Sequence, residues 1–228
     1  MKANNEWMSI SDMMAGLMMI FLFIAIAFMI EVQSEQDTIK EIAMTYRKSQ
    51  TSLNQDLHKE FEKDLERWGA EITQDNIFRF KSPEVLFKTG SSEISQDFKE
   101  IINDFFPRYL KILTSQDYLK EIDEIRVEGH TSNIWNTHST QDTIYLKNMS
   151  LSQDRANSVL TYCYKFIYEK SPLEAIWLEK KFRANGMAFA NPVFHDDGKN
   201  NNIKSQRVEF RVLTKAQEKI YKIIEAIN

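Results

Sequence analysis

One acidic residue lies inside a long apolar stretch near the N-terminus, and it is the clearest candidate for chemistry in this sequence. The stretch Trp7–Ile30 reads WMSISDMMAGLMMIFLFIAIAFMI, and eighteen residues, Met13–Ile30, carry no ionisable side chain. Asp12 lies just before them. A carboxylate at membrane depth is costly unless it is protonated or paired, so such acids usually serve ion pathways. We therefore expect Asp12 to bind a permeating ion, either a proton or sodium.

The neighbours of Asp12 support two interpretations. Ala15 and Gly16 follow it by three and four residues, so on a helix they share its face and let a second helix approach closely. On the other hand, Ser9 and Asp12 have the S-x-x-D spacing of a helix-capping box. In that case the acid only starts the helix and carries no ion.

The apolar stretch is long enough to cross a membrane. Counted from Met8 to Ile30 it spans roughly 34 Å of helix, against about 30 Å of hydrocarbon. It exceeds the core of a cleaved signal peptide, which has about 7–15 residues, and no A-x-A cleavage site precedes a plausible mature start. Lys2 on one side and the acids Glu31, Glu35 and Asp37 on the other favour a cytoplasmic N-terminus. We expect an uncleaved, single-pass anchor.

Composition excludes several functional classes. The net charge of −4 gives no basic surface for nucleic acid. Cys163 is the lone cysteine, so no intramolecular disulfide forms, and we expect it in the core. His130 and His138 lack further ligands at metal-binding spacing, and no nucleophile or phosphate-binding motif occurs. The sequence predicts no enzyme, metal site or cofactor other than the translocated ion.

After the apolar stretch, residues 34–69 favour a helical stalk. This segment has no proline before Gly69, and its apolar residues recur at spacings of three and four. Leu53, Leu57 and Phe61 belong to this series. We expect two copies of the stalk to pair as a short coiled coil, with Gly69 ending the helix.

From residue 70 the pattern changes to short strands and helices. We expect strands at 72–80, 84–87, 122–127, 182–187 and 207–213, helices at 95–113, 150–168 and 216–227, a short helix at 177–178, and loops at 129–147 and 190–202. Pro107 is expected to bend or split its helix. The sequence therefore predicts three parts, 1–33, 34–69 and 70–228, the last an α+β sandwich with helices on one face of its sheet.

Five segments in the last part resemble the peptidoglycan-binding domain of the OmpA/MotB superfamily. They read VLFKTGSSEI, IRVEGHTSN, NMSLSQDRANSV, RANGMAFANPV and NNIKSQRVEFRV, in order between Val85 and Val212. The family pattern is G-H-T-D, N-x-x-L-S-x-x-R-A, G-x-x-x-x-x-P and R-R-V-E. The resemblance implies an OmpA-like βαβαββ-type domain. Joined to a membrane helix that carries an acid, it resembles a MotB-type stator B-subunit, and the segments SDMMAGLMMIFLFIAI, PEVLFKTGSSEI and FFPRYLKIL resemble the B-subunits of Zorya anti-phage systems.

The resemblance supplies expected ligand-binding residues. Arg155 matches the family arginine and would hold a carboxylate of the peptidoglycan stem peptide as a bidentate pair. Asn148 and Leu151 match the family asparagine and leucine, and Thr131 would line the same pocket. The alternative for Arg155 is a surface salt bridge on its helix, for example with Asp154.

One position departs from the family pattern. Ser132 stands where the family has the aspartate of G-H-T-D, which pairs with the amino group of diaminopimelate. Either the negative partner is missing, which would change selectivity or affinity for the stem peptide, or Asp142 in the loop that follows replaces it.

The expected function is that of a motor subunit. Two copies of this chain would stand inside a ring of a polytopic MotA/ZorA-like membrane subunit in the bacterial inner membrane, with the last part periplasmic and bound to peptidoglycan. A flagellar-type stator, or a purely structural tether with Asp12 as a cap, are the alternatives.

Overall fold

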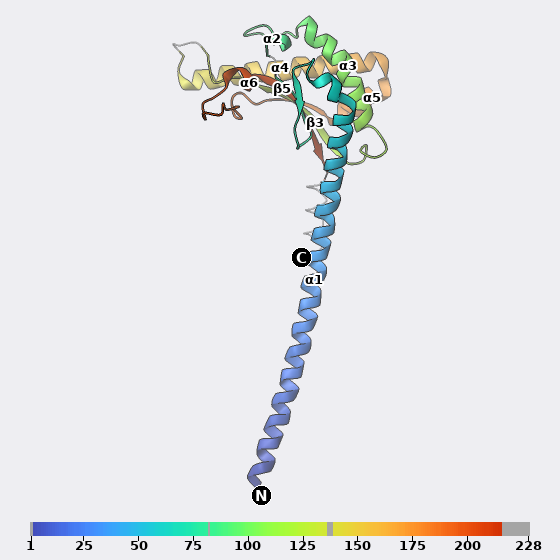
Figure 1. The fold of residues 1–228 in the computed structure, drawn as a ribbon, viewed down its shortest axis with the longest axis vertical. Helices are drawn as coiled ribbons and strands as arrows, with labels where there is room; N and C mark the ends of the chain where they lie inside the picture. Colours follow the sequence, from blue (N-terminus) through green and yellow to red (C-terminus); the bar gives the residue numbers. More distant parts are fainter. Residues whose placement is uncertain (1, 82, 136–138, 216–228) are drawn as a thin grey trace. The chain divides into compact units, whose positions relative to one another are not determined.

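The computed structural model describes residues 2–81, 83–135 and 139–215 of the chain (Figure 1). The chain divides into two compact units, which in their described parts comprise residues 2–48 and residues 49–215. The expected helix at 216–227 lies outside the described residues. Each unit is described by itself below.

The first unit consists of the N-terminal part of helix α1 (Lys2–Leu65). Its segment Ile10–Glu41 has a mean hydropathy of 2.7 over its most apolar window, and none of that window is buried within the chain. By length and composition this segment can cross a membrane. The helix already begins at Lys2, so Asp12 lies well inside it and not in its first turn. The capping interpretation of Asp12 is therefore wrong, because the orphan N–H groups that a cap serves lie about three turns earlier.

The second unit contains the C-terminal part of α1, which packs into the globular core. Leu53, Leu57 and Phe61 are buried to 2%, 0% and 0% exposure, and the Phe61 ring lies 5.3 Å from that of Phe78 and 5.4 Å from that of Phe105. The expected coiled-coil seam over these residues is wrong, since they already have partners in the same chain. Residues 49–69, expected in the stalk, belong to the globular unit. For residues 34–48 the paired stalk stays a prediction.

A five-stranded mixed sheet forms the centre of the second unit. Its order is β1-β2-β5-β3-β4, and only the β3–β4 pair among these strands is parallel. The strands are β1 (Ala70–Ile72), β2 (Ile77–Phe80), β3 (Ile122–His130), β4 (Phe182–Gly186) and β5 (Arg207–Thr214). This mixed sheet with its helices confirms the expected α+β class.

The helices of this unit differ from the expected ones at two places. They are α2 (Pro83–Leu86), α3 (Gln96–Leu113), α4 (Gln141–Lys170), α5 (Pro172–Lys181) and α6 (Asn202–Ser205). The expected strand at 84–87 is wrong, because α2 occupies most of it. The expected loop at 129–147 is too long: β3 continues to His130, and α4 begins at Gln141.

Helix α3 shows how local sequence sets an element. The Ser95 hydroxyl caps it by accepting a hydrogen bond of 3.0 Å from the backbone N–H of Phe98. Pro107 lies inside the helix without splitting it. Gly69, after α1, has φ +57°, which is the left-handed conformation expected of a glycine that ends a helix.

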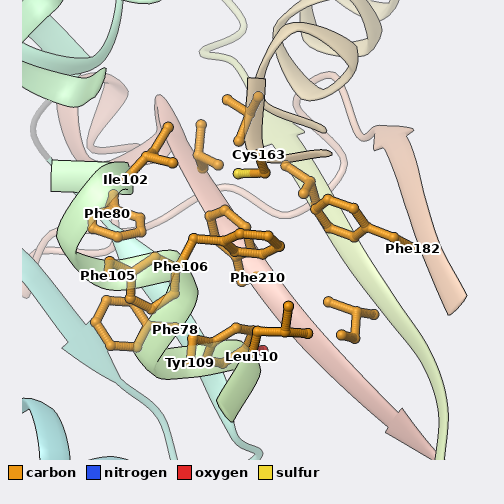
Figure 2. Close-up of a cluster of buried hydrophobic side chains, with 14 of the residues drawn as sticks. Phe78, Phe80, Ile102, Phe105, Phe106, Tyr109, Leu110, Cys163, Phe182 and Phe210 are labelled. Atoms are coloured by element: carbon orange, nitrogen blue, oxygen red, sulfur yellow. The ribbon is translucent and has the colours of Figure 1, made fainter. Parts of the chain in front are cut away.

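The core lies between α3 and one face of the sheet (Figure 2). Figure 2 shows the rings of Phe105, Phe106 and Tyr109 gathered around Phe210 of β5, with centroids 5.1 to 6.0 Å away. Alternation along a strand sends every second side chain to this face. Cys163 of α4 is fully buried here as a free thiol, which confirms its expected place in the core.

Candidate functional site

Two glycines bring α4 against the ends of β3 and β4. A Cβ added to Gly129 would lie 2.2 Å from the backbone oxygen of Ser152, and one added to Gly186 would lie 2.6 Å from the backbone nitrogen of Gln153. No larger residue fits at either point without moving the helix. This contact places the residues after Gly129 beside the side chains of α4 near Ser152.

A cavity of about 340 Å³ lies at this junction. Several of the expected ligand-binding residues meet there, although they come from different segments. Its described lining comprises Thr89, Gly90, Thr131, Ser132, Ile134, Trp135, Asn148, Leu151, Arg155 and Gln206. The fold therefore brings Thr131 and Ser132, which follow β3, together with Asn148, Leu151 and Arg155 of α4.

Arg155 is held firmly at this cavity. It is 5% exposed, its Nε donates a hydrogen bond of 2.9 Å to the backbone oxygen of Ser91, and its guanidinium lies 4.9 Å from the centre of the Phe87 ring. A surface salt bridge with Asp154 is thus the wrong interpretation. Burial lowers the pKa of Arg155, but a guanidinium starts so high that it stays charged at neutral pH.

The turn before the cavity positions the acceptor of Arg155. The backbone N–H of Ser91 donates to the Lys88 oxygen at 2.9 Å, and Gly90 adopts φ +70°, as a turn of this kind requires. An isolated bridge between Phe87 and Ile94 closes its base. These contacts define a turn at Lys88–Ser91, whose part in the cavity was not predicted.

Neutral polar groups complete the cavity wall. Thr131 and Ser132 are buried to 3% and 7% exposure, and the Thr131 hydroxyl has no hydrogen-bond partner among the described residues. The side-chain nitrogen of Asn148 donates to the backbone oxygen of Ile144 at 3.0 Å. An unpartnered buried hydroxyl is costly to the folded state.

Asp142 does not reach this cavity. It lies in the first turn of α4, six residues before Asn148 or roughly 9 Å along the helix axis, and it is exposed. A hydrogen bond from Thr140 and the backbone of Thr143 lower the pKa of its carboxyl. The expected replacement of the family aspartate by Asp142 is therefore not supported, because the helix starts too early to leave that residue in a loop.

Sequence reasoning missed part of the lining. Thr89, Gly90, Ile134, Trp135 and Gln206 lie outside the motif positions that we expected to bind ligand. Trp135, a half-buried tryptophan close after the G-H-T-S motif, was the one available signal. Trp135 also has the Lys147 ammonium 5.7 Å from its ring centre.

On the sheet surface opposite the core, charged side chains form a buried network that the sequence did not predict. Glu128 and Glu209 are partners across β3 and β5, and the Nε2 of His130 lies 3.7 Å and 3.6 Å from their carboxylates. These three residues offer ligand atoms within 4.8 Å of one another. The expectation that His130 has no possible metal ligands beside it is therefore wrong. His138, the other expected non-ligand, lies outside the described residues.

Arginines already neutralise this network. Glu209 accepts from the Nε of Arg207 at 2.6 Å and from the Nε of Arg79 at 2.7 Å, and Glu128 accepts from the Nε of Arg211 at 3.0 Å. A divalent cation would have to enter beside three guanidinium groups. We therefore regard the cluster as a structural ion-pair network.

The network controls the pKa values of both acids. Burial by itself would raise the pKa of Glu128 and of Glu209, but His130 and the neighbouring arginines outweigh it. The pKa of Glu128 is lowered, and that of Glu209 is lowered strongly. Both carboxylates are thus charged at neutral pH.

Asp12 lies in the first unit, on a part of α1 that is exposed within the chain. A Cβ added to Gly16, one turn further, would meet nothing within 4 Å. Asp12, Ala15 and Gly16 thus form a face of small residues and one acid that is open to another helix.

Comparisons with known proteins indicate the same families as the sequence motifs. The model of the OmpA family matches residues 86–206, more than half of the chain. The Zorya protein ZorB of Escherichia coli is 45% identical over 223 residues, which cover 97% of this chain and 93% of that protein.

Solved structures were also compared. A MotB-like protein from Desulfovibrio vulgaris aligns with a TM-score of 0.50 at 20% identity, covering 72% of this chain and 91% of that one. The periplasmic domain of Helicobacter pylori MotB aligns with a TM-score of 0.45 at 22% identity, covering 69% and 97%. At 20% identity, the similarity to the Desulfovibrio vulgaris protein shows a shared fold and nothing more.

Proposed function

This chain belongs to the OmpA family and to the family of the Zorya protein ZorB, and from that premise we propose that it is the B-subunit of an ion-driven motor that protects bacteria from phage. One observation carries the proposal. A single chain combines an acid well inside an apolar, membrane-length helix with an arginine facing a cavity in an OmpA-type domain. A motor anchored to the cell wall needs both.

The cavity supplies the wall-binding half of the proposal. Arg155 is fixed through its Nε, so the terminal nitrogens of its guanidinium can pair with a carboxylate of the peptidoglycan stem peptide. Asn148, Thr131 and Ser132 offer neutral hydrogen-bonding groups around it, and Leu151 adds an apolar wall. The bound wall would then hold the subunit still.

Asp12 supplies the ion-carrying half. It would bind and release a proton, or a sodium ion, as the helices of a partner subunit pass it. A change of charge at this position alters which contacts the helix favours, and that alternation can turn a surrounding ring. We place the N-terminus in the cytoplasm, the helix in the inner membrane and the OmpA-type domain in the periplasm.

The partners follow from the same proposal. Two copies of this chain would stand within a ring of a polytopic MotA/ZorA-like subunit. A flagellar-type stator would use the same parts, whereas a structural tether would need neither the acid nor the ring. Purification of the full chain from membranes tests this difference, because a tether would come without a stoichiometric polytopic partner.

Sedimentation with purified peptidoglycan tests the anchor. The full chain in detergent micelles should sediment with the wall at physiological salt. Arg155→Ala should reduce binding more than tenfold, since it leaves a ligand carboxylate unpaired at a cost of about 2–5 kcal/mol.

Asp142→Ala is the matched control for this experiment. It also removes one charge, but from a residue outside the cavity lining, so it should bind as the wild type does. A wild-type chain that stays in the supernatant would contradict the anchor.

A further inference from the structure

The charge of the cavity is unbalanced. Of the described residues that line it, Arg155 is the only ionisable one, and the nine others are neutral. Its terminal guanidinium nitrogens form no ion pair within the described residues. Low exposure weakens solvent screening, so this positive charge acts strongly on whatever enters.

The neutral groups beside the arginine match an uncharged amide. The side-chain nitrogen of Asn148 donates to the backbone oxygen of Ile144, and that of Gln206 donates to the backbone oxygen of Asn202 at 3.3 Å. One N–H of each amide is therefore occupied, while the amide oxygen can accept a hydrogen bond. The Thr131 hydroxyl, which has no partner among the described residues, can donate or accept.

An ammonium group would find a poor environment in the same place. A cation beside a buried guanidinium is repelled, and no carboxylate is among the described lining residues to offset that repulsion. An amide N–H has no charge to be repelled, and a neutral oxygen can accept its hydrogen bond. The apolar side chains of Ile134, Trp135 and Leu151 suit the carbon atoms of an acyl group.

From this arrangement we propose that the cavity selects a carboxylate whose neighbouring nitrogen is acylated, and discriminates against the free zwitterionic amino acid. The inference rests on the proposed binding of peptidoglycan. In a peptidoglycan stem peptide the side-chain amine of the diamino acid is free before cross-linking and becomes an amide in the cross-link. The subunit therefore binds cross-linked wall in preference to uncross-linked wall.

Two matched peptides test the proposal directly. One is a stem tripeptide ending in meso-diaminopimelate with its distal amine free, and the other is the same peptide with that amine acetylated. Binding to the full chain in detergent micelles is measured by isothermal titration calorimetry. A change in the fluorescence of Trp135 provides a second readout from the cavity. We expect the acetylated peptide to bind at least tenfold more tightly, and equal or reversed affinities would overturn the proposal.

Ser132 provides the control for the electrostatic cause. Ser132→Asp adds a carboxylate to the lining and should narrow or reverse the preference, by strengthening binding of the free amine. Ser132→Asn adds similar bulk without charge and should keep the wild-type preference. If Ser132→Asn changes the preference as much as Ser132→Asp, shape and not charge is responsible, and the proposal fails.

The outcome separates this inference from the anchor itself. A chain that sediments with peptidoglycan but prefers the free amine keeps the proposed function and loses this inference. A chain that sediments but binds neither peptide places the wall contact elsewhere and also overturns it. A chain that neither sediments nor binds contradicts both.

Discussion

At the scale of single residues, the binding cavity depends on which charges are absent as much as on those present. Ser132 lines the cavity where the family pattern has an acid, and Asp142, the nearest acid that follows in the sequence, begins a helix outside it. Arg155 is therefore left as the single described charge in the lining. The same motif positions are kept, but their electrostatic balance is changed.

The buried ion-pair network gives a pH-dependent prediction. The pKa of Glu209 is lower in the folded chain than in the unfolded one, so its stabilising contribution is present above the unfolded value of about 4.3 and is lost as pH falls through the folded value. Glu209→Gln leaves Arg207 and Arg79 without their shared carboxylate. At pH 7 it should lower the free energy of unfolding by about 3–5 kcal/mol.

Urea unfolding between pH 7 and pH 3 measures this effect. The difference between wild type and Glu209→Gln should be largest at neutral pH and shrink once the pH passes below about 4. Glu93→Gln, at an exposed position, is the control and should stay within about 0.5 kcal/mol of wild type. A difference that does not change with pH would contradict the assigned role of Glu209.

At the scale of elements, one helix serves two units. The residues of α1 up to Lys48 belong to the membrane-spanning unit, and those from Ser49 belong to the globular one. Arg108 of α3 joins this second part by pairing with Glu60 at 2.7 Å and Asp64 at 2.9 Å. The end of α1 is thus an integral layer of the domain.

This arrangement predicts the effect of mutating α1. Phe61→Ala removes a fully buried ring that contacts Trp68, Phe78 and Phe105, and should lower the free energy of unfolding by about 3–5 kcal/mol. Met44→Ala, at a side chain that is 64% exposed, should change it by less than about 0.5 kcal/mol. Thermal or urea unfolding distinguishes this from a stalk role, in which Phe61→Ala would weaken crosslinking between copies and leave unfolding unchanged.

At the scale of the whole molecule, the proposed motor needs the ion carrier and the wall anchor to act in one chain. Asp12→Asn keeps the size of the side chain but removes its charge. It should leave membrane insertion, partner binding and peptidoglycan sedimentation intact, and abolish protection in a phage plaque assay. Asp37→Asn removes a charge from an exposed position that pairs with Lys40 at 3.6 Å, and should keep protection. Full protection by Asp12→Asn would remove the ion-carrier role and favour the tether.

The sequence by itself determined the properties that depend on composition and short spacing. The apolar run from Met13 to Ile30 predicts a membrane-length helix, because crossing a bilayer requires only length and low polarity. The α+β class, the helix near 95–113 and the core position of Cys163 also followed from local patterns. The motif set between Val85 and Val212 correctly indicated the OmpA family, whose model matches residues 86–206.

Tertiary structure decided what depends on residues far apart in the chain. The apolar spacing of Leu53, Leu57 and Phe61 fits a partner helix and a domain core equally well, since both bury one face of a helix. Only the fold shows that the core is the partner. In the same way Glu128 and Glu209 meet through strand pairing, and Gln206 and Trp135 line one cavity with Arg155 although they are far apart in the sequence. Long-range contacts leave no periodicity in the sequence, and for that reason the charge of the cavity could be read only from the folded chain.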